Sequence, residues 1–153
     1  MKQQYKSAKE SFELAIQMDP QFHIAYLNLA MLYLKETDVD SALEQVSIAE
    51  RTCTNCPFMH YIKSICYANK DTIDLSFRHI QQSIKLNPNE SIFYLMLGDL
   101  FYSNRQLELA ISNWDKATAN AECGHLLQTR YRHLHFDQIS VNYWTTPEYL
   151  CLR

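Results

Sequence analysis

The sequence predicts an all-α protein built as a solenoid of helix-turn-helix repeats, and three observations support this prediction. Side chains of similar size recur every 34 residues, without a gap, over most of the chain. Within each unit the apolar positions are spaced by three, four and seven residues, which is helical periodicity. Only two glycines occur among the 153 residues, so the chain offers few left-handed turn positions for a sheet of hairpins.

The repeat is clearest in the second helix of each unit, where two small residues flank a large one. The small positions are Ala8, Ala42, Ser76 and Ala110, followed by Ala15, Ala49, Ser83 and Ala117, and the large position between them is Phe12, Val46, Ile80 and Trp114. Small residues let two helices approach closely, and large ones fill the space between successive helix pairs. We therefore expect these positions to form the core.

The elements follow in order along the chain. The array is expected to span 1–122, with a second-helix half-unit at 4–20 and full units at 23–56, 57–90 and 91–122. Each unit holds two helices, the first at about 23–35, 58–69 and 90–103 and the second at about 40–52, 74–86 and 107–119. Breaking and capping residues stand between these helices: Asp19-Pro20, Cys56-Pro57 and Asn87-Pro88 between units, and Asp38, Asp71 and Asn104 inside them. Residues 123–153 do not continue the repeat and are expected to form a capping helix and a tail.

This pattern resembles the tetratricopeptide repeat family, which carries an aromatic, Leu-Gly and a second aromatic on the first helix, then Ala, Phe, Ala and Pro on the second. The third unit matches best, at Tyr94, Leu97, Gly98, Phe101, Ala110, Trp114 and Ala117. The second unit departs from the pattern at His60, Lys63 and Ser64. The resemblance implies a right-handed α-solenoid and a non-enzymatic interaction module, such as an adaptor, scaffold or chaperone, that binds its ligand on the concave surface lined by the first helices.

The face of the first helices opposite the core is also apolar. Its residues are Ile24, Leu27, Met31 and Leu34, then Phe58, Tyr61, Ile65 and Ala68, then Ile92, Leu95, Asp99 and Tyr102. An apolar groove of this extent exceeds what a soluble monomer normally leaves exposed, so we expect an apolar or amphipathic protein segment to cover it. The predicted partner-binding residues are Ile24, Leu27, Asn28, Met31, Phe58, Tyr61, Ile65, Leu95, Asp99 and Tyr102.

Three alternatives stay open at this point. In the first, residues 137–153 close the groove themselves, which would give the chain a structural or oligomerising role. In the second, the first helices are rotated by one residue from the assignment above, which would place part of the stripe in the core. The third alternative is an RNA-binding helical repeat. The formal charge of −3 and the absence of cations among the ten predicted residues make nucleic acid and acidic peptides unfavourable ligands.

Cys53 and Cys56 have the spacing of a redox dithiol or of half a zinc site. On the 34-residue grid, however, they lie in a connector between two units, and Pro57 begins the next helix as a favoured first-turn proline. A second Cys pair does not accompany them, and we expect no metal, cofactor or catalytic site. Five cysteines, an odd number, favour reduced thiols and a cytoplasmic location, and no stretch of the sequence is apolar enough to suggest membrane insertion.

Overall fold

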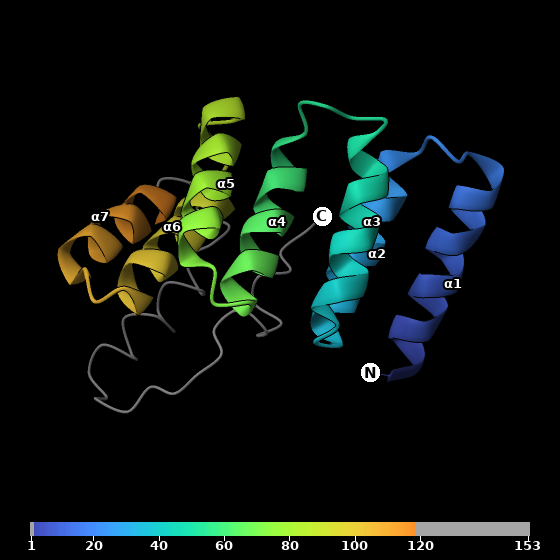
Figure 1. The fold of residues 1–153 in the computed structure, drawn as a ribbon, viewed down its shortest axis with the longest axis horizontal. Coiled ribbons are helices and arrows are strands. Elements are labelled where there is room, and N and C mark those ends of the chain that lie inside the picture. Colours follow the sequence, from blue (N-terminus) through green and yellow to red (C-terminus); the bar gives the residue numbers. More distant parts are fainter. Residues whose placement is uncertain (1, 119–153) are drawn as a thin grey trace.

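The computed structural model describes residues 2–118, and within them it consists of seven α-helices without a strand (Figure 1). The helices are α1 Lys2–Met18, α2 His23–Lys35, α3 Val39–Glu50, α4 Pro57–Asn69, α5 Ile73–Leu86, α6 Ser91–Ser103 and α7 Leu107–Thr118. The all-α prediction is confirmed, and α2 to α7 begin and end within two residues of the expected bounds. The capping helix and tail expected at 123–153 lie outside the described residues.

The helices pack as successive antiparallel pairs, α2 with α3, α4 with α5 and α6 with α7. The first helices α2, α4 and α6 contact one another in turn, and each second helix also contacts the first helix that follows it. Helix α1 packs against α2 at one end of the array, and α7 lies at the other end (Figure 1). Each pair therefore buries its apolar faces against its neighbours, as expected for a solenoid.

The turn inside each pair repeats the same backbone geometry. Thr37, Asp71 and Arg105 have positive φ angles of 62°, 56° and 59°. In each case the following residue donates its backbone N–H to a carbonyl near the end of the first helix, with an N···O distance of 2.9 Å. The three pairs are Asp38 to Tyr33, Thr72 to Tyr67 and Gln106 to Phe101. These left-handed residues end the first helices in the way that a glycine commonly does, and they lie 34 residues apart. The repeat is thus present in the backbone as well as in the side chains.

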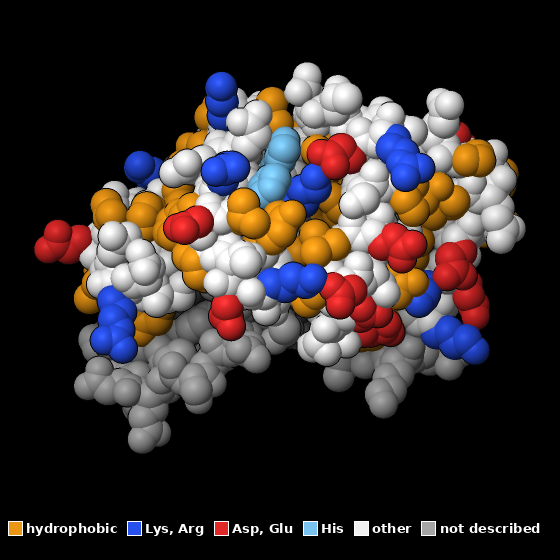
Figure 2. All heavy atoms as spheres, viewed as in Figure 1, with side chains coloured by type: hydrophobic (Ala, Val, Ile, Leu, Met, Phe, Trp, Pro, Cys, Tyr) orange, Lys and Arg blue, Asp and Glu red, His pale blue; other side chains and the backbone are white. Residues whose placement is uncertain are grey.

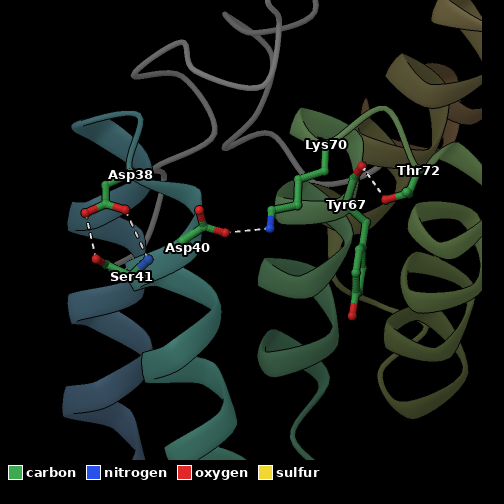
Figure 3. A network of polar contacts seen from close by, with 6 residues as sticks. All are labelled: Asp38, Asp40, Ser41, Tyr67, Lys70 and Thr72. Carbon is green, nitrogen blue, oxygen red and sulfur yellow. Dashed lines mark hydrogen bonds and ion pairs between the residues drawn. The ribbon is translucent and has the colours of Figure 1, made fainter.

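Polar contacts tie the turn ends of the first two pairs together (Figure 3). Asp38 caps α3, because its carboxylate accepts the Ser41 backbone N–H at 3.0 Å and the Ser41 hydroxyl at 2.6 Å. These two bonds lower the pKa of the Asp38 carboxyl. Lys70, just past the end of α4, forms an ion pair with Asp40 in the first turn of α3. The predicted capping role of Asp38 is confirmed.

The small and large positions of α3, α5 and α7 form the core. Each of these side chains is at most 1% exposed: Ala42, Val46, Ala49, Ser76, Ile80, Ser83, Ala110, Trp114 and Ala117. The equivalent residues of α1, which are Ala8, Phe12 and Ala15, are only half-buried. Within the described residues, α2 is the only helix that α1 contacts extensively. The face of α1 that carries Ala8, Phe12 and Ala15 therefore keeps partial access to solvent.

Candidate functional site

The ten predicted partner-binding residues lie on the three first helices, α2, α4 and α6, and we call them the inner stripe. Six of them are buried and form what we call its floor: Leu27, Met31, Tyr61, Ile65, Leu95 and Asp99. The other four reach the surface and form its rim: Ile24, Asn28, Phe58 and Tyr102. Ile24 is the most accessible, with 48% of its surface exposed. An open apolar groove along all ten residues was expected, and the structure instead limits access to the rim.

The centre of the floor is aromatic and joins α4 to α6. The Tyr61 ring lies 5.5 Å from the Phe93 ring, and Phe58 lies 5.2 Å from the same ring in an edge-on arrangement. Both Tyr61 and Phe93 have no exposed surface. Offset and edge-on aromatic pairs add to the free energy gained by burial alone. The half-buried Phe58 of the rim is therefore held in place by its contacts with the buried rings of Tyr61 and Phe93.

Asp99, the one acidic residue among the ten predicted partner-binding residues, is 2% exposed. Its carboxylate accepts a hydrogen bond from the Trp114 indole Nε1 at 2.8 Å. The Tyr102 ring of the rim lies 5.6 Å from the same indole. Sequence reasoning missed this contact, although one signal was present: the unit with the acidic residue in its stripe is also the unit with tryptophan at the large position.

Comparison with known proteins identifies the architecture. A family model described as tetratricopeptide repeat matches residues 2–22. Human Tetratricopeptide repeat protein 6 is 24% identical over 113 residues, and the match spans 74% of this chain but only 22% of that protein. A solved thermophilic TPR protein of Thermus thermophilus superposes with a TM-score of 0.70 at 20% identity, covering 82% of this chain and 70% of that one. The chain has the fold of the tetratricopeptide-repeat solenoids, and the family model matches its first helix.

A second solved structure, that of MamA, has the same fold. It superposes with a TM-score of 0.64 at 17% identity and covers 97% of this chain and 84% of that one. In these repeats the inner stripe occupies the first helices, the surface that the sequence resemblance assigned to ligands. The second pair keeps the register despite its departures at His60, Lys63 and Ser64, because Ser64 is fully buried like its equivalent Ala30.

The polar residues of the second repeat lie away from the inner stripe. His60 and His79 face each other across α4 and α5 with 3.1 Å between their Nδ1 atoms, and the His79 ring stacks on Tyr67. Burial and the neighbouring His60 lower the pKa of His79 to about 4, and burial also lowers the pKa of His60. Lys63 pairs with Glu50 at 2.8 Å. These contacts account for His60 and Lys63 as packing and pairing residues between helices.

The face of the repeats seen in Figure 2 mixes both signs of charge. Cationic and anionic side chains alternate over this face, with apolar side chains between them. A nucleic-acid surface requires clustered cations. This face therefore has no charge pattern that would favour a phosphate backbone.

Two further properties concern metals and membranes. Among the described residues, one group of three side chains could hold a metal ion, namely His23, Cys53 and Cys56. Sequence reasoning considered the cysteines but missed the histidine, which is 30 residues earlier in the chain. Within residues 2–118, no helix combines the length and the apolar character that crossing a bilayer requires.

Proposed function

We propose that this repeat array is a non-enzymatic protein–protein interaction module that binds an amphipathic segment of a partner protein along the inner stripe. The observation that supports this proposal is the apolar character of α2 and α6 on both faces, although one face of each already packs in the core. The accessible apolar residues of the stripe are Ile24 at one end, Phe58 in the middle and Tyr102 at the other end. They span all three first helices, which suits a segment lying across the repeats.

The rim favours an amphipathic segment over an acidic one. Its accessible residues are two aromatics, an isoleucine and Asn28, and none of the ten stripe residues is a cation. Asn28 offers a donor and an acceptor for one polar contact. An acidic peptide would lose its hydration without gaining a counter-charge.

The burial pattern also bounds the affinity. Completing the burial of three partly exposed side chains contributes roughly half of 1.5–3 kcal/mol each, or about 2–5 kcal/mol in all, before association costs. A micromolar complex needs about 8 kcal/mol. A complex that uses the rim alone is therefore weak and transient, which suits an adaptor or scaffold. A chaperone that holds its client tightly would also need the buried side chains of the floor to become accessible. We propose a cytoplasmic location for this module, where cellular reductants would keep Cys53 and Cys56, which form a disulfide in the structure, as thiols.

The test uses a pair of equally exposed apolar residues. Ile24 is 48% exposed on the rim, whereas Leu109 is 46% exposed on α7, away from the stripe. A photo-crosslinking amino acid at position 24 should capture partner proteins, and the same probe at position 109 should not. With the probe at position 24, Tyr102→Glu should lose the captured set, whereas Leu109→Glu should retain it. Identical capture from both positions would contradict the proposal.

The variants must lie on the rim and not on the floor. Leu27→Glu and Leu95→Glu are unsuitable, because these side chains are only 8% and 0% exposed and a buried carboxylate would destabilise the fold. Thermal melting followed by circular dichroism checks that each surface variant folds. Binding of oligouridylate that weakens with salt and is unaffected by Ile24→Glu would instead favour the RNA-binding alternative.

A further inference from the structure

Three side chains from separate segments meet where the first pair joins the second. His23 is the first residue of α2, Cys53 lies in the connector after α3, and Cys56 is the N-cap residue of α4. A ring nitrogen of His23 and the two sulfur atoms lie within 4.8 Å of one another, and all three residues are half-buried. In the structure Cys53 and Cys56 form a disulfide with 5.8 Å between their Cα atoms.

The donor set is the one that zinc prefers. Zinc binds Cys sulfur at about 2.3 Å and His nitrogen at about 2.0–2.1 Å in a tetrahedral arrangement, which places neighbouring donors about 3.5–4 Å apart. Donors within 4.8 Å of one another reach that arrangement through small side-chain movements, once the sulfur–sulfur bond is broken. Half-buried positions exclude part of the solvent but leave a path for the ion.

The local backbone also favours thiolates over thiols. Cys56 stands at the N-terminus of α4, where the helix dipole stabilises negative charge, and it makes no side-chain capping hydrogen bond. His23 stands at the N-terminus of α2, so two helix starts flank the cluster. By contrast, burial raises the pKa of the Cys66 thiol to about 12, which keeps that thiol protonated.

We propose that His23, Cys53 and Cys56 bind one zinc ion when the Cys53–Cys56 disulfide is reduced. A dithiol reductant supplies two electrons and two protons, the sulfur–sulfur bond breaks, and the reductant becomes a disulfide. Each thiol then releases its proton to solvent as its thiolate binds Zn²⁺, and the neutral imidazole of His23 supplies the third donor. The fourth position of the tetrahedron is left to water.

This site has a structural consequence that the disulfide lacks. The disulfide closes a loop within one connector, because its two cysteines are three residues apart. A bound zinc ion would instead join that connector to the start of α2 through His23. Reduction in the presence of zinc therefore exchanges a local link for one between the first helix of one repeat and the first helix of the next.

The experiment uses the full chain, reduced under anaerobic conditions, with Co²⁺ and then Zn²⁺ as probes. The background carries Cys123→Ser and Cys151→Ser, because these cysteines lie outside the described residues. We expect one Co²⁺ per chain with thiolate-to-cobalt absorption, displaced by one Zn²⁺. Cys53→Ala and Cys56→Ser should each abolish this absorption, and His23→Gln should weaken zinc affinity at least tenfold. Cys66→Ser is the matched control and should bind as the background does.

Three results would overturn the proposal. The first is no binding by the reduced chain at micromolar metal, and the second is equal binding by the oxidised chain. The third is unchanged affinity and spectrum in His23→Gln, which would mean that the dithiol alone takes up metal. Circular dichroism of each variant before titration separates loss of the site from loss of the fold. Because His23 is half-buried, we expect His23→Gln to fold, so the zinc affinity of this variant tests the proposal even if a cysteine variant fails to fold.

Discussion

The second and third repeats place different chemistry at the same positions. In the α4–α5 pair, the Ser64 hydroxyl donates to the Ser76 carbonyl at 3.0 Å and the Ser76 hydroxyl donates to the Ser64 carbonyl at 2.8 Å. In the α6–α7 pair the equivalent residues are Gly98 and Ala110, and a tryptophan indole fills the contact. The 34-residue register therefore fixes where two helices touch, and the side chains decide whether hydrogen bonds or close packing hold them.

The first repeat extends this comparison. The small position of the first helix and the large position of the second are Ala30 with Val46, Ser64 with Ile80 and Gly98 with Trp114. The largest of the three large residues, Trp114, lies against Gly98, which has no side chain. Close packing explains this match, since the volume between two helices at a fixed distance must be filled without overlap.

The largest expected effect comes from adding one carbon atom to the third repeat. A Cβ at position 98 would lie 2.3 and 2.5 Å from atoms of the Trp114 indole and 3.0 Å from the Ala110 carbonyl oxygen. Both neighbours are held in the core, so Gly98→Ala should lower the free energy of unfolding by about 3 kcal/mol or more through overpacking. Urea unfolding followed by circular dichroism measures this change.

A double-mutant cycle connects the result to the comparison between repeats. In a background with Trp114→Ile, which installs the residue of the second repeat, Gly98→Ala should cost markedly less. Equal costs in the two backgrounds would show that the indole is not what restricts position 98.

A smaller effect is expected in the polar contact of the second repeat. Ser64→Ala or Ser76→Ala should each cost about 1 kcal/mol, because each removes a buried hydrogen bond. The double variant recreates the Ala30 and Ala42 pair of the first repeat and should cost less than the sum of the single variants. Chemical denaturation of the four proteins tests this, and single variants as stable as the parent would mean that the serine contact contributes nothing measurable.

The sequence alone predicted the helices, their pairing and most of the core, because these depend on the spacing of small and large residues within one unit. It did not point to Thr37 and Arg105 as left-handed residues, since neither is the glycine or asparagine that such a position favours. The backbone hydrogen bonds from Asp38 to Tyr33 and from Gln106 to Phe101 close these two turns.

The site was harder to predict than the fold for a related reason. The contact of Asp99 with Trp114 joins residues that are 15 positions apart on two helices. The cluster of His23 with Cys53 and Cys56 joins the start of one helix to a connector about 30 positions later. Such contacts depend on the rotation of each helix and on side-chain rotamers, which a spacing pattern does not specify. Spacing also assigned the inner stripe to one face without revealing which of its side chains reach the solvent.

The smallest expected effect is the pH dependence that His79 gives to the second repeat. The third repeat has Asn113 at this position, and Tyr94 in place of His60, so the titrating pair belongs to one repeat. Burial and His60, with a smaller contribution from Lys63 opposed by Glu50, lower the pKa of His79 from 6.5 to about 4. The folded chain therefore keeps His79 neutral over a range in which the unfolded chain takes up a proton.

This difference fixes the sign of the effect. Between pH 6.5 and about 4 the unfolded state binds more protons, so the stability that His79 contributes is present above pH 6.5 and is lost as the pH falls toward 4. Because the side chain is only half-buried, solvent screening reduces the loss to about 0.5–1 kcal/mol. His79→Asn, which installs the third-repeat residue, should flatten this part of the stability curve. Urea unfolding of the parent and the variant at pH 7 and pH 4.5 measures the difference, and parallel losses in the two proteins would place the pH dependence in other groups.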